Sequence, residues 1–191
     1  MSAFASNFVQ ISGLWGDDGV LPANSYLERI KTWPDMEISL GGILWEGVEI
    51  VVDWVNGVCG LDAYSNVETG LYAICLIGTL LSLGALLSHR INNSFTFLAL
   101  WLLYQANFWV GQTFLSFQWD ILLLEIGFIA IFYARFPLFN NGDETSLVQL
   151  MAREGLRWAL FRLMFASGVL KVSSNCQTWT SYTALYYHYE T

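Results

Sequence analysis

Residues 71–88, LYAICLIGTLLSLGALLS, form a run of eighteen residues without a charged side chain. A helix needs about 20 mostly apolar residues, with a range of about 17–25, to cross the hydrocarbon core of a bilayer. The run falls within that range, so it predicts a transmembrane helix.

Three weaker apolar segments follow, each interrupted by polar or charged residues. A short apolar run of this kind could also be a core helix of a soluble protein. Composition favours the membrane: 55% of the residues are hydrophobic and only 13% are charged, against about 25% charged in a soluble domain. So few charges could not cover a soluble core. We therefore expect an all-α, multipass membrane protein in contact with membrane lipid, with about four transmembrane helices at residues 71–88, 95–110, 120–136 and 155–172.

The charge is distributed unevenly along the chain. Residues 1–70 carry ten acidic and two basic side chains, whereas residues 71–191 carry six of each. No basic patch is present in the sequence, so nucleic acid is not expected as a partner. The division predicts an acidic N-terminal segment, 1–70, that is lumenal or interfacial, and a helical bundle with a short tail, 71–191.

The acidic segment contains two recognisable patterns. Residues 13–25, GLWGDDGVLPANS, are rich in turn-forming residues and predict an irregular loop at the membrane surface. Residues 40–55 have a helical pattern in which Glu46, Glu49 and Asp53 share one face. This pattern predicts an amphipathic helix on the membrane or on the bundle.

The positive charges near the span ends predict an orientation. Arg90 lies in the first connection between spans, and Arg135 and Arg153 flank the third, whereas residues 111–120 in the second contain no Lys or Arg. Cytoplasmic connections are enriched in these residues. The first and third connections are therefore expected in the cytosol, and residues 1–70 and the C-terminal tail in the lumen.

The three cysteines fall at different expected depths. Cys75 lies within the first span and is expected to be a small buried hydrophobe. Cys59 and Cys176 both fall on the expected lumenal side, where a disulfide between them could form. Two alternatives are also open: both thiols stay free, or one of them pairs with a cysteine outside this chain. The glycosylation sequon at Asn92 falls on the expected cytosolic side, so we expect no glycan there.

The sequence lacks the residue sets of common catalytic and metal sites. It has two histidines, no C-x-x-C and no G-x-S-x-G. We therefore expect no catalytic residues, no metal site and no cofactor.

Several polar side chains nevertheless lie within the predicted spans. At 1.5 Å per residue, Gln105 and Glu125 both lie roughly 7 Å below the lumenal ends of their spans. Because an intramembrane charge needs a partner, Glu125 is expected to accept a hydrogen bond from Gln105 and to pair with Arg162 or Lys171. Asp120 is expected at the interface, without a partner.

This polar cluster has two interpretations. The first is structural, because polar contacts hold helices together where lipid removes the hydrophobic drive. The second is functional, with Glu125 acting as the acid or base of a membrane-embedded enzyme, or with Glu125 and Arg162 lining a transporter-like path. A separate pattern, Gly78, Ser82 and Ala85 at i, i+4 and i+7, predicts a face of small residues packed against another helix.

Long stretches of the chain resemble the lipase maturation factor family. They are VGQTFLSFQWDILLLEIGF at 110–128, LRWALFRLMFASGVLKVSSNCQTWTSYTALYYHYET at 156–191, QISGLWGDDGVLPA at 10–23 and LLSLGALL at 80–87. Agreement is weaker over residues 24–70. The resemblance is greater to the second vertebrate-type branch than to the founding lipase factor.

The resemblance implies a multipass membrane protein of the endoplasmic reticulum. Such a protein would assist the folding, assembly and maturation of secreted lipases as a chaperone-like factor, with the lipases as its clients and without catalytic residues. Family members begin with a further span and continue into more spans and a large lumenal domain. The chain therefore resembles a fragment truncated at both ends.

Overall fold

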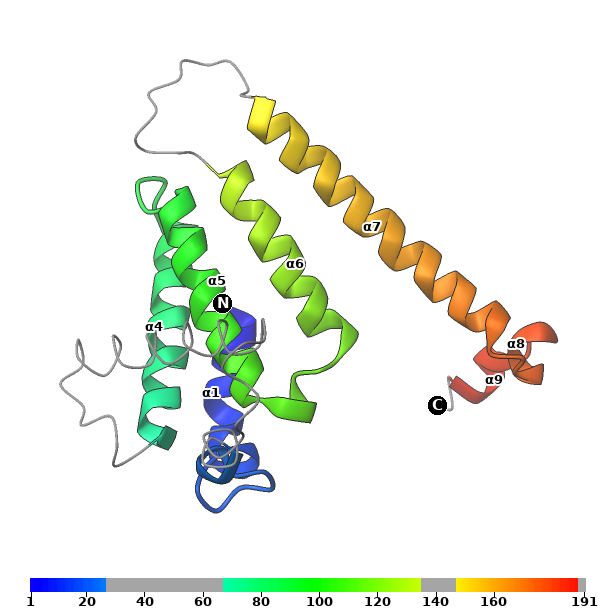
Figure 1. Cartoon of the computed structure of the whole chain (residues 1–191), viewed down its shortest axis with the longest axis horizontal. Helices are drawn as coiled ribbons and strands as arrows, with labels where there is room; N and C mark the ends of the chain where they lie inside the picture. The colour runs from blue at the N-terminus through cyan, green and yellow to red at the C-terminus, as the bar shows by residue number, and fades with distance from the viewer. Residues whose placement is uncertain (27–66, 135–146, 189–191) are drawn as a thin grey trace, which may run out of the picture. The chain divides into compact units, whose positions relative to one another are not determined.

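A computed structural model describes residues 1–26, 67–134 and 147–188. Within these ranges the chain is helical and contains no strand, which confirms the expected all-α class for this part of the chain (Figure 1). The amphipathic helix expected at 40–55 lies outside the described residues. The elements are α1 (Ser2–Leu14), α4 (Val67–Leu87), α5 (Ser94–Val110), the short 3₁₀ helix η1 (Gln112–Phe114), α6 (Gln118–Tyr133), α7 (Leu147–Ser173), α8 (Gln177–Thr180) and α9 (Ala184–His188).

The chain divides by packing into two compact units, Met1–Glu144 and Thr145–Thr191. The first unit contains α1, α4, α5 and α6, and the second contains α7, α8 and α9. The boundary expected at residue 70 concerns which segment lies outside the membrane, whereas the two units are defined by packing. It therefore stays a prediction.

In the first unit, each helix packs against the next: α1 against α4, α4 against α5, and α5 against α6. Six residues join α4 to α5 and seven join α5 to α6, and short connections of this kind produce antiparallel neighbours. Asn93 starts α5 as its N-cap, since its side chain accepts a hydrogen bond from the Thr96 backbone amide at 3.1 Å. The hydroxyl of buried Ser94 donates to the Ala134 carbonyl at 3.0 Å and so ties the start of α5 to the end of α6.

The N-terminal helix α1 is a full member of this unit. Phe4, Asn7 and Ile11 are buried and occur at i, i+3 and i+7, so they form one face of the helix. Phe4 packs against Gly78 near the middle of α4, while the Asp17 amide, after the end of α1, donates to the Glu68 carboxylate at 3.1 Å near the start of α4. Helices α1 and α4 therefore run antiparallel.

The expected contact of the small-residue face with another helix is confirmed at one of its three positions, Gly78. It is buried, and a Cβ added there would lie 2.6 Å from the Phe4 ring. Helix α1 can approach α4 this closely because the glycine has no side chain.

Among the helices in the described ranges, α4 is long and apolar enough to cross a membrane by length and composition. It has 21 residues, and its most apolar window has a mean hydropathy of 2.1. Helices α5 and α6, with 17 and 16 residues, are about 24–26 Å long, somewhat less than the ~30 Å hydrocarbon core. Helix α7 has 27 residues but carries several charges. The count of four spans therefore stays a prediction.

Candidate functional site

The first unit contains a hydrogen-bonded polar pair, one member buried and the other half-buried, that joins α5 to α6. Tyr104 is only 4% exposed, and its hydroxyl donates to an Asp120 carboxylate oxygen at 2.7 Å. The Phe4 ring meets the Tyr104 ring edge-on, with centroids 5.5 Å apart and planes at 88°. The expectation that Asp120 lacks a partner was wrong, because α5 brings Tyr104 beside the first turn of α6.

A second polar contact joins α4 to α5. Cys75 is fully buried, as expected, and its thiol donates to the Asn107 carboxamide oxygen at 3.4 Å. The Asn107 amide nitrogen donates to the Leu103 carbonyl of its own helix at 3.1 Å. Both ends of this buried carboxamide are therefore satisfied, which removes most of the cost of placing it in the core.

A third contact anchors the turn that follows α1. Trp15 is 3% exposed, and its indole nitrogen donates to the Gly111 carbonyl at the end of α5 at 3.3 Å. Trp15 also packs in a cluster with Ile11, Leu71 and Val110. The turn-rich segment that begins at Gly13 therefore contains a core anchor, which the sequence pattern did not predict.

The residues of the predicted polar cluster fall in both units. Gln105 and Glu125 are half-buried on α5 and α6 of the first unit. Arg162 and Lys171 lie on α7 of the second, where the Lys171 ammonium is 4.8 Å from the centre of the Trp179 ring. The predicted pairing of Glu125 with one of these cations stays a prediction.

The lumenal cysteine pair also stays a prediction, because Cys59 lies outside the described residues. Cys176 is an exposed free thiol 2.9 Å from the Thr178 hydroxyl. This hydrogen bond, followed by those from the Thr178 and Trp179 backbone amides, lowers the pKa of the Cys176 thiol. A lowered pKa makes a thiol more reactive near neutral pH.

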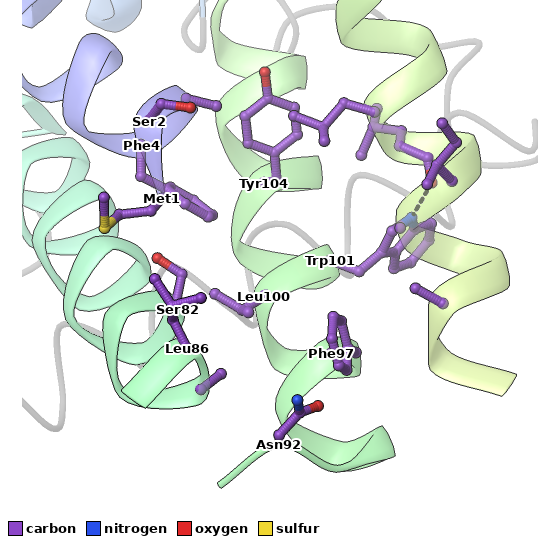
Figure 2. A pocket seen from close by; sticks show the side chains of 17 residues that line it. Met1, Ser2, Phe4, Ser82, Leu86, Asn92, Phe97, Leu100, Trp101 and Tyr104 are labelled. Atoms are coloured by element: carbon purple, nitrogen blue, oxygen red, sulfur yellow. Dashed lines mark hydrogen bonds between the residues drawn. The ribbon is translucent and has the colours of Figure 1, made fainter. Parts of the chain in front are cut away.

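Beside the Tyr104–Asp120 pair lies a cavity of about 460 Å³. Figure 2 shows Phe4 and Tyr104 at one end of the cavity, Asn92 and Phe97 at the other, and Leu100 between them. Its walls come from α1, α4, the connection after α4, α5 and α6. The lining is mainly apolar, so the site suits packing or apolar binding better than acid–base chemistry.

The Tyr104–Asp120 bond gives a direct test of its structural role. Tyr104→Phe removes the hydroxyl and leaves half-buried Asp120 without this donor, so the free energy of unfolding should fall by about 1–3 kcal/mol. Asp120→Asn preserves an acceptor and should cost less. We expect non-additive losses in the double variant, measured by thermal unfolding of the full-length protein in detergent. Strictly additive losses would contradict the bond.

Comparison with known proteins assigns a family. Residues 1–191 match the family described as "Lipase maturation factor transmembrane domain". The chain is 46% identical over 196 residues to Lipase maturation factor 2 of Xenopus laevis, covering 99% of this chain and 25% of that protein. It is 44% identical to Lipase maturation factor 2 of Mus musculus, covering 99% and 26%. It is 32% identical to Lipase maturation factor 1 of Bos taurus, covering 99% and 32%. No solved structure matches the chain.

The chain thus spans about a quarter of the length of the factor 2 relatives. Its match to a transmembrane domain identifies a membrane protein, and its greater identity to factor 2 than to factor 1 confirms the predicted branch. These relatives are named as maturation factors and not as enzymes, in agreement with the expected lack of catalytic activity. The chain belongs to the lipase maturation factor family.

Proposed function

We propose that this chain is part of a multipass membrane factor of the endoplasmic reticulum that assists the folding, assembly and maturation of secreted lipases. The observation that carries the proposal is the match of the whole chain to the family's transmembrane domain, with 46% identity to a protein named Lipase maturation factor 2. Helices α4, α5, α6 and α7 would be its four spans, with the acidic N-terminal segment in the lumen.

The geometry of the first unit supports a structural role for its interior. The buried polar side chains of Tyr104 and Asn107 make hydrogen bonds with neighbouring helices, which is how membrane helices are held together. Trp15 joins the turn after α1 to the end of α5 in the same way. This interior holds helices together and would support a chaperone-like domain elsewhere in the full-length protein.

The proposal is tested by complementation. Cells that lack the endogenous factor would express the full-length protein together with a secreted lipase, and the specific activity of the secreted lipase would be measured. We expect specific activity to rise, while a secreted protein that is not a lipase stays unchanged. If lipase specific activity is the same with and without the factor, the proposal fails.

Glu125 separates a structural role from a chemical one. Glu125→Gln keeps the shape and most of the hydrogen bonding, so we expect near-normal lipase maturation and a stability loss within about 1 kcal/mol. Glu125→Leu should cost more, because it strands a cationic partner, although less than the about 3–5 kcal/mol of a fully buried pair. Both effects would be measured on full-length protein. If Glu125→Gln folds normally but abolishes maturation, the carboxylate has a chemical role.

Labelling of Cys176 tests the orientation. A membrane-impermeant maleimide should leave it unmodified in sealed microsomes and modify it once the microsomes are opened, in a full-length variant whose other cysteines except Cys59 are replaced. Since its pKa is lowered by the Thr178 hydrogen bond, labelling should persist to lower pH than in Thr178→Val. Labelling from the cytosolic side would overturn the topology.

The same preparation tests the cysteine pair. If labelling of Cys176 requires prior reduction and Cys59→Ser removes that requirement, a Cys59–Cys176 disulfide is present. If labelling proceeds equally without reductant, Cys176 is free in the native protein.

A further inference from the structure

The cavity beside Tyr104 has the size of a ligand site. Its volume of about 460 Å³ falls within the range of about 300–1,000 Å³ of small-molecule pockets. All of its lining residues belong to the first compact unit. The hydrogen bonds described above join the helices that form the walls of the cavity, and they do not fill the cavity itself.

Three of the polar groups in its wall already donate hydrogen bonds within the protein. The Tyr104 hydroxyl donates to Asp120, the Trp101 indole nitrogen to the Leu124 carbonyl at 3.0 Å, and the Ser82 hydroxyl to the Thr79 carbonyl at 2.9 Å. Figure 2 shows the Trp101 bond as a dashed line. A polar ligand would lose its hydration there without gaining these donors, whereas an apolar chain has no such cost.

The cavity opens at side chains that are both exposed and apolar. Leu86 on α4, which is 75% exposed, and Leu123 and Ile126 on α6, which are 43% and 38% exposed, all line it. Because α4 is long and apolar enough to cross a bilayer and the chain matches a transmembrane domain, a bilayer around this unit would place lipid next to these side chains. An acyl chain can therefore enter sideways from the bilayer.

One end of the cavity is polar and follows the end of α4, where a membrane-spanning α4 would reach the lipid headgroups. Asn92, in the connection between α4 and α5, lines that end, and Arg90 precedes it by two residues. Both side chains are exposed. A guanidinium group and a carboxamide at the membrane surface suit a phosphate and an anionic headgroup. From Ser94 to Tyr104, α5 extends about 15 Å along the cavity towards the end at Phe4 and Tyr104.

We propose that the cavity binds one acyl chain of an anionic phospholipid, with the headgroup at Arg90 and Asn92. The lipid fills the space between α1, α4, α5 and α6 and completes the packing of the unit. The proposal rests on the membrane location of the domain and not on its role in lipase maturation.

Photo-crosslinking of the full-length protein tests the proposal. Three nanodisc preparations would be compared: one with phosphatidylserine and one with phosphatidylcholine, each carrying a diazirine on one acyl chain, and one of plain phosphatidylcholine with a diazirine fatty acid. The adducts would be mapped by peptide mass spectrometry. We expect adducts on the segments 97–104 and 123–130, with phosphatidylserine preferred. Ala85→Phe, which fills the cavity, should reduce them about tenfold.

Two matched variants separate binding from folding. Ala99→Phe makes the same change on α5. Ala99 does not line the cavity and lies about 200° around the helix from the lining residue Phe97, so this variant should leave the adducts unchanged. Ala130→Leu, a milder filling of the cavity, should give an intermediate loss. Arg90→Gln should remove the preference for phosphatidylserine while adducts from phosphatidylcholine remain.

Several outcomes would overturn the proposal. Adducts that are spread evenly over the lipid-facing surface and do not respond to Ala85→Phe would show that the cavity holds no lipid. Adducts from the fatty acid alone would assign the site to a free acid. Crosslinks from the cavity to another segment of the full-length chain would show that protein fills it.

Discussion

Gly78→Leu is expected to disrupt the contact between α1 and α4 and to lower the free energy of unfolding by about 1–3 kcal/mol or more. A Cβ at this position already lies 2.6 Å from two Phe4 ring atoms and 2.8 Å from the atom that joins the ring to its Cβ. Phe4 is 5% exposed and packs edge-on against Tyr104, so its ring can move only towards the cavity that it lines. The leucine therefore has to push α1 away from α4 or force the Phe4 ring out of its contact with Tyr104.

Gly78→Ala has two opposing effects on the free energy of unfolding. Replacing glycine by alanine in a helix interior stabilises the helix by up to about 1 kcal/mol, whereas the overlap with Phe4 costs about 1–3 kcal/mol. Because the overlap with Phe4 outweighs the gain in helix propensity, we expect a net loss that is smaller than for leucine. Thermal unfolding of the full-length protein in detergent, followed by circular dichroism, measures both variants.

Two further variants establish that the clash with Phe4 is the cause. Gly84→Leu makes the same change on the same helix, where a Cβ lies at an ordinary 3.5 Å from Ile91, and should cost much less. Phe4→Ala should be destabilising alone but should reduce the additional cost of Gly78→Leu, a coupling that a double-mutant cycle detects. Equal costs at Gly78 and Gly84 would refute the packing argument.

Hydrophobicity predicted the positions of the main helices well. The predicted spans at 71–88, 95–110 and 155–172 lie on α4, α5 and α7. Their ends were less predictable: α4 starts at Val67 and α7 at Leu147, ahead of the apolar runs. The reason is that backbone hydrogen bonding continues a helix through charged residues such as Glu68 and Arg153, which an apolar run does not include.

Helix α1 could not be predicted with the same ease. Its buried face consists of Phe4, Asn7 and Ile11, and the polar Asn7 interrupts the apolar pattern. The i, i+3, i+7 spacing was the available signal. Isolated helices of about 13 residues are marginal in water, and α1 is stabilised by packing on α4, which no local pattern in the sequence reports.

The Tyr104–Asp120 hydrogen bond could not be predicted by counting residues from the helix ends. Such counting ignores any shift of α5 relative to α6 along their axes. Tyr104 lies about 9 Å from the end of α5 and Asp120 about 3 Å from the start of α6, yet they are hydrogen-bonded. The seven residues between the helices include the 3₁₀ turn η1, so the two helix ends do not lie at the same level. Residues at equal distances from the ends of two helices therefore lie at the same depth only where the two helix ends are themselves at the same level.

Trp15→Ala is expected to cost about 3–5 kcal/mol, the usual range for removing a buried aromatic side chain. The indole is 3% exposed, packs with Ile11, Leu71 and Val110, and lies 6.5 Å from the Phe114 ring centre. Against a total stability of about 5–15 kcal/mol, such a loss should lower the yield of folded full-length protein and its thermal midpoint in detergent.

Trp15→Phe separates packing from hydrogen bonding. Phenylalanine retains most of the ring but removes the donor to the Gly111 carbonyl, so we expect a loss of about 1–3 kcal/mol. Trp158→Ala, at a side chain on α7 that is 65% exposed, is the control for deleting an indole without deleting a core contact. If Trp158→Ala and Trp15→Ala shift the midpoint equally, Trp15 is not the anchor between the turn after α1 and the end of α5. Both Trp15 variants lose the hydrogen-bond donor, but only Trp15→Phe keeps an aromatic ring. If the two variants lower the thermal midpoint equally, the hydrogen bond to Gly111 therefore contributes more than the packing of the ring.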